Sequence, residues 1–273
     1  MSAEKDITLD EKRVYGAKAG STPAFVATGA GLARVEVSAD LVGEFSLVHR
    51  GDVRDVVGSE GRLAVAGDDA LVGTGDGFEP TEFGPATAVG FHDGLVAAGA
   101  GRVARHDGDA WVDLAAVEDV RTIAGGMLAA AGGVVRLDGT HVGLDDARDV
   151  TTDGEILAAT ADGLYYLANG WMDALDGGFR AVAADGDRAY AVSDEGTLYR
   201  RTDDEWVDTG APGDVADVAL SDDAVYAVTT GGTFLANAGE VSGRGPDARE
   251  AEPHGGWRDR MLGLPEARRV AVP

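Results

Sequence analysis

The sequence predicts an all-β fold: a seven-bladed β-propeller that forms a single domain over residues 1–273 and is closed by exchange of its terminal strands. A unit of about 30 to 38 residues recurs along the chain, which is the sequence signature of a repeat architecture. The chain holds 41 glycines and eight Asp-Gly pairs, and Asp-Gly suits tight hairpins because both central residues tolerate positive φ. These breaks leave no stretch long enough for an amphipathic helix.

The second strand of each unit is its clearest mark, a short run of small and apolar residues followed by a glycine-containing turn. Seven such runs occur, at 25–28, 63–66, 95–98, 128–131, 156–159, 190–193 and 226–229. A third strand is expected after each turn, at 32–35, 71–72, 103–104, 134–137, 164–167, 198–199 and 234–235. Four short strands in each repeat are typical of propeller blades.

The first and fourth strands of the units are shorter but carry their own marks. From the second unit on, a first strand is centred on a valine, at positions 56, 89, 120, 150, 182 and 218. A fourth strand often carries an aromatic residue followed two positions later by Asp, as in Trp111/Asp113, Trp171/Asp173, Trp206/Asp208 and Trp257/Asp259. We expect these tryptophans to pack between blades rather than to bind a cofactor.

The last residues of the chain begin an eighth unit. Residues 268–272 repeat the first-strand pattern of residues 180–183, and they follow the fourth strand of the seventh unit. We expect the C-terminus to give the first blade a strand, because this removes an open sheet edge. The N-terminal segment 13–15 is a rival for the same place, and the sequence does not choose between them.

Charge is the strongest compositional signal. The net charge is −25, from 48 acidic and 23 basic residues, and only three of the basic residues are lysines. Acidic residues are spread along the chain, which favours adaptation to molar salt over a single site for a basic partner. The same charge argues against a nucleic-acid surface. The N-terminus lacks an apolar leader and no 18-residue apolar run occurs, so we expect a cytoplasmic protein that does not contact membranes. We expect it to be a monomer from a halophile. No cysteine is present. No cofactor motif stands out either, so we expect no cofactor.

Two segments resemble known blades. Residues 157–165 read Leu-Ala-Ala-Thr-Ala-Asp-Gly-Leu-Tyr and residues 190–199 read Tyr-Ala-Val-Ser-Asp-Glu-Gly-Thr-Leu-Tyr, which is similar to BNR-type propellers, a group that includes sialidases and photosystem assembly factors. With Arg-Val-Tyr-Gly at 13–16 and the segment 27–35, the whole chain resembles a haloarchaeal β-propeller family of unassigned function. The sialidase Asp-box survives weakly at 202–206 and no arginine triad accompanies it, so the resemblance implies a fold and no glycosidase activity.

Four of the first strands are preceded by aspartate: Asp55, Asp119, Asp149 and Asp217. If these side chains point into the channel at one end, they form a ring of carboxylates at its mouth that could hold a hard cation. The remaining units carry Ala88, Ala181 and Arg269 at this position, so the ring is incomplete. The simpler interpretation is that each Asp accepts hydrogen bonds from nearby backbone amides where a strand starts.

One segment, 237–256, interrupts the repeat as an insertion in the last blade. The region 240–273 has six arginines and six acidic residues, so it is neutral within a strongly acidic chain. Long loops in compact domains are usually functional or disordered. The candidate partner-binding residues are Arg244, Arg249, His254, Arg258 and Arg260.

Taken alone, the sequence favours a non-enzymatic propeller that acts as a protein-interaction scaffold with a protein partner. It singles out no catalytic residue. A metal-dependent hydrolase or lyase with its site in the channel is the alternative, because a fold does not choose among functions.

Overall fold

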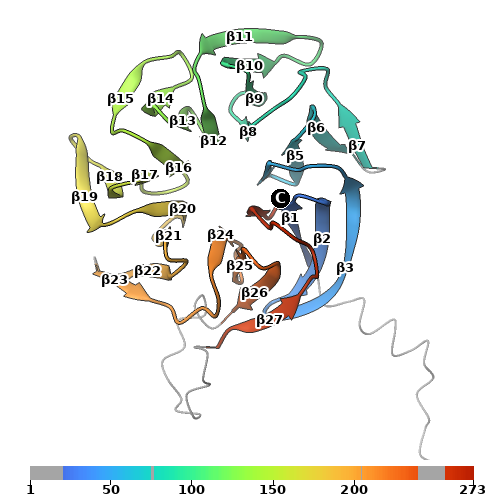
Figure 1. Ribbon diagram of the computed structural model, residues 1–273, viewed down its shortest axis with the longest axis vertical. Helices are drawn as coiled ribbons and strands as arrows, with labels where there is room; N and C mark the ends of the chain where they lie inside the picture. The colour runs from blue at the N-terminus through green and yellow to red at the C-terminus, as the bar shows by residue number, and fades with distance from the viewer. Residues whose placement is uncertain (1–20, 75–76, 204, 239–255) are drawn as a thin grey trace, which may run out of the picture.

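The computed structural model describes residues 21–74, 77–203, 205–238 and 256–273 of the chain. In these ranges every element is a strand, and the strands form seven four-stranded antiparallel sheets arranged around one axis (Figure 1). The prediction of a seven-bladed all-β propeller is therefore confirmed. The described residues include no helix long and apolar enough to cross a membrane.

Each sheet is one blade, and its strands run in order from the axis to the rim. Blades 1 to 3 consist of β28 (Arg269–Ala271), β1 (Thr22–Thr28), β2 (Gly31–Ser38) and β3 (Leu41–Arg50); β4 (Asp55–Ser59), β5 (Arg62–Ala66), β6 (Ala70–Thr74) and β7 (Gly77–Pro80); β8 (Ala88–Phe91), β9 (Leu95–Gly99), β10 (Arg102–His106) and β11 (Trp111–Ala116). Blades 4 and 5 consist of β12 (Val120–Ala124), β13 (Met127–Ala130), β14 (Gly133–Arg136) and β15 (His141–Gly143); β16 (Ala147–Thr151), β17 (Leu157–Thr160), β18 (Gly163–Leu167) and β19 (Trp171–Asp176). Blades 6 and 7 consist of β20 (Phe179–Asp185), β21 (Arg188–Ser193), β22 (Leu198–Thr202) and β23 (Glu205–Asp208); β24 (Val215–Leu220), β25 (Val225–Thr229), β26 (Thr233–Asn237) and β27 (Arg258–Met261).

The second strand of each blade is the most buried because a neighbouring blade covers each of its faces. All five residues of β9 and all five of β25 are buried. Alanine and valine dominate these strands, and their small side chains let twisted sheets approach closely near the axis. The outer strands are the reverse case, and all four residues of β27 are exposed.

The C-terminal strand closes the ring. In β28, Ala271, Val270 and Arg269 pair antiparallel with Phe25, Val26 and Ala27 of β1. The last residues of the chain thus form the innermost strand of blade 1, as predicted, while its other three strands come from the N-terminal part. The rival segment 13–15 lies outside the described residues.

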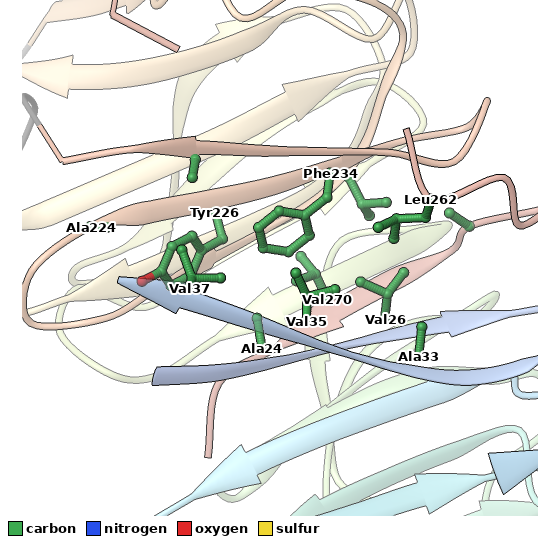
Figure 2. Packing of buried hydrophobic residues seen from close by; sticks show 13 residues of the cluster. Ala24, Val26, Ala33, Val35, Val37, Ala224, Tyr226, Phe234, Leu262 and Val270 are labelled. Carbon is green, nitrogen blue, oxygen red and sulfur yellow. The ribbon is translucent and has the colours of Figure 1, made fainter. Parts of the chain in front are cut away.

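A cluster of buried hydrophobic side chains packs in the joint between the last and first blades (Figure 2). Tyr226 and Phe234 of blade 7 are buried against Val35 and Val37 of β2, and Val270 of β28 joins the same cluster. Burying one such side chain contributes about 1.5–3 kcal/mol. The seam that closes the propeller is therefore held by core packing as well as by strand pairing.

Tryptophans of the outer strands connect neighbouring blades. The indole N–H of Trp111 donates to the Thr81 carbonyl of blade 2, over 2.8 Å. Trp171 donates in the same way to Val142, and Trp257 donates to Thr209, each in the preceding blade and over 3.3 Å. The expectation that the Trp-x-Asp pattern serves blade packing is met at these three positions.

Candidate functional site

One residue at the start of each inner strand lines the propeller axis at the same level. The strand pairing defines these positions, since each one lies opposite an equivalent residue of the second strand of its blade. We call this set the axial ring, and going round from blade 1 it consists of Arg269, Asp55, Ala88, Thr122, Asp149, Ala181 and Asp217.

Arg269 reaches across the channel to all three aspartates of the axial ring. Its Nη1 lies 3.1 Å from Oδ2 of Asp149 and 3.2 Å from Oδ1 of Asp217, and its Nε lies 3.9 Å from Oδ1 of Asp55. The Arg269 side chain is 16% exposed and the carboxylates are 6–7% exposed. A guanidinium therefore sits among the carboxylates that the sequence offered as a cation site.

The same carboxylates accept hydrogen bonds from backbone amides of two blades. Asp55 receives the N–H of Val56 in its own strand and that of Val89 in the next blade, each over 3.0 Å. Asp149 bonds Val150 and Val182 in the same pattern, also over 3.0 Å. Such bonds to ionised acceptors are about twice as strong as neutral ones. The simpler interpretation of these residues, bonding to amides at the start of a strand, describes what the structure shows, and it extends across the blade boundary.

Asp217 completes this pattern at the joint between blades 7 and 1. Its Oδ2 accepts the N–H of Val270 over 2.8 Å, and its Oδ1 accepts a hydrogen bond from the Arg269 side chain. One carboxylate therefore binds both the backbone and a side chain of β28. Burial raises the pKa of Asp217 to about 7 despite the attraction of Arg269, and the nearby charge of Asp149 adds to the rise. Burial likewise raises the pKa of Asp55. For Arg269, burial opposes the charged form, but the three carboxylates outweigh it and raise its pKa.

The raised pKa of Asp217 predicts a pH-dependent stability. An unfolded Asp ionises near pH 3.8, so between that pH and about 7 the folded protein binds the extra proton, and stability falls as pH rises. Asp217→Asn keeps an acceptor for Val270 but cannot ionise. We expect its free energy of unfolding to gain on that of the wild type as pH rises from 5 to 8, by at most about 1.4 kcal/mol per pH unit.

Urea denaturation of both proteins at matched KCl concentration measures this difference. Asp214→Asn is the matched control, because Asp214 is an exposed carboxylate on the same blade. Parallel pH profiles for wild type and Asp217→Asn would contradict the assignment.

The expectation that Asp119 joins the other three aspartates is not met. Asp119 lies exposed in the turn before β12, with φ at 50°. Val120 pairs before a β-bulge as Ala147 does in blade 5, so Thr122 takes the axial position and Ile123, not Val120, corresponds to Val150. The hydroxyl of Thr122 is buried without a hydrogen-bond partner in the described part of the chain.

A second feature, which the sequence analysis missed, is a row of arginines directly before the axial ring. Four of them donate to a carbonyl of the following blade: Arg268 to Val53 over 3.1 Å, Arg54 to Ala86 over 3.1 Å, Arg121 to Ala147 over 2.9 Å and Arg180 to Val215 over 3.3 Å. Arg148 instead pairs with Asp194 of the next blade. The signal was present in the sequence as an arginine one position before the axial residue in five of seven repeats.

These arginines are neutralised where they stand. Arg121 lies 2.6 Å from Asp146, Arg180 lies 3.0 Å from Asp214, and Arg268 lies 2.7 Å from Asp52. The Arg268 contact lowers the pKa of Asp52. The row therefore links blades and is not a free basic surface.

Of the residues suggested for partner binding, the structure places two. Arg258 pairs with Asp40 of blade 1 over 2.8 Å. Arg260 donates to the Gly43 carbonyl over 2.7 Å and lies over the Phe45 ring, 5.4 Å from its centroid. Arg244, Arg249 and His254 lie outside the described residues, as does most of the insertion 237–256. The described residues hold no group of three or more His, Asp or Glu side chains arranged for a metal ion.

The fold and the axial ring define the class of protein: a closed seven-bladed β-propeller whose C-terminal strand completes the first blade and fills the channel with a charged cluster. The chain belongs to the family described as "Beta-prop_HVO_0234:-like, beta propeller", whose model matches residues 8–273, and the family name is haloarchaeal.

Solved structures share the fold of this chain, but their likeness shows no family relationship. No curated protein matches the chain. The extracellular domain of the one-component system BT4673 from B. thetaiotaomicron is similar, with a TM-score of 0.58 and 12% identity. The match covers 78% of this chain and only 38% of that protein's chain. The computationally designed protein Ika8 has a TM-score of 0.55 and 12% identity, covering 92% of this chain and 91% of its own. YCF48 bound to D1 peptide has a TM-score of 0.52 and 12% identity, covering 77% and 81%. At these identities the likeness shows the fold alone.

Proposed function

We propose that this propeller is a non-enzymatic scaffold that binds a protein partner through its outer surface. The observation that carries the proposal is the joint between blades 7 and 1, where exposed Leu41 and Met261 lie on two outer strands that arginines connect. We call this surface the closing seam, and it consists of Asp40, Leu41, Phe45, Arg258, Arg260 and Met261.

Leu41 and Met261 are the most exposed large apolar side chains of the described residues, at 60% and 63%. Leu41 begins β3 and Met261 ends β27, the two outer strands that Arg258 and Arg260 hold together. Arginine and large apolar groups are enriched at protein interfaces, whereas most of this surface is acidic. The closing seam therefore has the composition of a docking site in a chain of net charge −25.

The place of the insertion supports the same surface. Residues 237–256 lead directly into β27, so a partner on the closing seam meets the end of that segment at Gly256 and Trp257. Trp257 itself is buried and bonded to Thr209, which leaves Arg258 and Arg260 as the exposed groups. Propellers carry binding on surfaces supported by a rigid scaffold, and the similar propeller YCF48 is bound to a D1 peptide.

A channel enzyme is the less favoured function. The three channel carboxylates are already bonded to Arg269 and to backbone amides, and a substrate or metal ion there must displace a buried guanidinium. Breaking a buried ion pair of this kind costs about 3–5 kcal/mol.

We also propose that the chain works in the salt-rich cytoplasm of a halophile and that its blades are of the BNR type. The dispersed negative charge supports the first proposal, and the turn sequences at 157–165 and 190–199 support the second.

Affinity purification at molar KCl from native cells tests the scaffold function. We expect Leu41→Glu with Met261→Glu to reduce recovery of the specific partner at least about tenfold, because two charges are placed in an apolar contact. The matched control is Val112→Glu with Met172→Glu, two exposed apolar residues on the outer strands of blades 3 and 5. Equal recovery with both pairs, or loss only with the control pair, would remove the closing seam as the docking site.

A further inference from the structure

A groove of about 590 Å³ opens between blades 1 and 2. Phe25 of β1 and Leu63 and Phe78 of blade 2 form its apolar walls, and Pro23 and Pro273 also line it. A groove of this volume is large enough to take several side chains or a small ligand.

Strand register shows how the outer part of this joint differs from the joints that carry a tryptophan. In blades 3, 5 and 6 the outer two strands present the cross-strand pairs His106–Trp111, Leu167–Trp171 and Arg201–Trp206 at one position. Blade 2 presents Gly73–Phe78 at that position. A smaller ring replaces Trp in blade 2, and no side chain stands beside it. A Cβ at neighbouring Gly61 or Gly77 would meet nothing within 4 Å.

The described chain begins at the rim of this groove. Pro23 lines it and lies only two residues beyond Ser21, where the described structure starts. The family model nevertheless matches from residue 8, so residues 8–20 belong to the same family unit as the propeller. Six residues span at most about 20 Å when extended, so Tyr15 is within reach of the whole groove from Ser21.

The composition of the N-terminal segment suits this surface. Residues 1–20 contain four basic and four acidic residues and all three lysines of the chain, so the segment is neutral beside a body that carries the net charge of −25. Val14 and Tyr15 are its adjacent large apolar residues within the matched range. Burying an exposed aromatic side chain in an apolar site contributes about 1.5–3 kcal/mol.

We propose that residues 8–20 of this chain dock in the groove between blades 1 and 2, with Val14 and Tyr15 as the apolar anchors. The segment that competed in the sequence for the ring-closing position thus takes a different place. It lies against Phe78, the residue at the tryptophan position of blade 2, and shields Phe25 and Phe78 from water.

Disulfide trapping tests this directly, because the natural chain has no cysteine. The variant carries Gly73→Cys and Gly16→Cys, which keeps both anchors; a Cβ at Gly73 faces the Phe78 ring at 3.6 Å and needs only a small shift of Leu63. The control carries Gly16→Cys and Gly170→Cys, since Gly170 is an exposed turn residue of blade 5 with open space around it. We expect the first pair to form an intramolecular disulfide at least about tenfold faster than the second, because docking raises the effective concentration of the thiols.

A second measurement keeps the inference testable if a cysteine variant fails to fold. A chain that lacks residues 2–20 is titrated with a synthetic peptide of residues 5–20, and the melting temperature of the shortened chain should rise with peptide concentration. The same peptide with Tyr15→Ala should lose most of this effect, and the peptide with Ile7→Ala should keep it. Filling the groove with Gly73→Leu should abolish it.

Three outcomes would overturn the proposal. Equal trapping rates for the two cysteine pairs would show that the segment does not rest in the groove. A peptide effect that survives both Tyr15→Ala and Gly73→Leu would place the segment elsewhere. Disulfides that form only between molecules would assign the groove to a second copy of this chain.

Discussion

Replacing Arg269 with Met is expected to lower the free energy of unfolding by about 3–5 kcal/mol, the usual cost of breaking a buried ion pair from one side. The substitution leaves Asp55, Asp149 and Asp217 buried without their guanidinium, and the three carboxylates then repel one another. Deleting residues 267–273 should do more harm, because it also removes β28 and exposes the edge of β1. Urea denaturation at fixed KCl measures the first change, and size-exclusion chromatography detects aggregation in the second.

Arg268→Met is the matched control for this experiment. Arg268 is the adjacent residue of the same segment, but it is half-buried and pairs with carboxylates that remain accessible to water, so we expect a loss of about 0–1 kcal/mol. Adding Asp55→Asn, Asp149→Asn and Asp217→Asn to Arg269→Met should restore most of the stability, because no buried charge is left unpaired. Similar losses of stability for Arg268→Met and Arg269→Met, with no restoration, would contradict the view that the ion pairs of the axial ring stabilise the closed propeller.

Raising KCl from about 0.1 M to 3 M is expected to raise the melting temperature substantially. At low salt the charges of a chain with net charge −25 repel one another over about 10 Å, and at 3 M this range falls below about 3 Å. The compact state gains most because it holds the charges closest together. Differential scanning calorimetry over a series of KCl concentrations measures the effect.

Surface charge reversal separates this effect from general salting-out. Asp109→Lys, Asp187→Lys and Glu195→Lys change exposed side chains, and each changes the net charge by two. The combined variant should melt higher than the wild type at low salt and respond less to KCl. A melting temperature that stays constant between about 0.1 M and 3 M would contradict adaptation to high salt.

The number of blades and the closure could be predicted because both depend on local, repeated patterns. The second strands are runs such as Tyr226-Ala227-Val228-Thr229, and the eighth repeat begins at Arg268. Each pattern is contained within a few residues, so counting repeats is enough. The structure places β25 and β28 at these runs.

The axial ring could be predicted only in part, because the sequence does not show which apolar residue of a first strand follows the axial position. Asp55, Asp149 and Asp217 were found since each stands directly before a valine inside an inner strand. Asp119 also precedes a valine, but Val120 begins β12, and Ile123 takes the place that Val150 has in blade 5. Blades 4 and 5 carry the same bulge at this point, so Thr122, and not Asp119, is equivalent to Asp149.

The ion pairs of the candidate site could not be read from the sequence because they join distant blades. Arg269 meets Asp149 across 120 positions of the chain, and Arg258 meets Asp40 across 218. Only ring closure brings these residues together. Once it does, the channel carboxylates become partners of an arginine, and the arginines of the closing seam become contacts between the first and last blades.

Partner recovery by the channel variant tests the central claim most directly. The variant combines Arg269→Met with Asp55→Asn, Asp149→Asn and Asp217→Asn, which removes every charge of the axial ring while leaving the outer surface unchanged. In affinity purification at molar KCl, we predict that this variant recovers the partner as well as the wild type, whereas Leu41→Glu with Met261→Glu does not. Loss of the partner from the folded channel variant, with full recovery by the seam variant, would place the functional site in the channel and contradict the account.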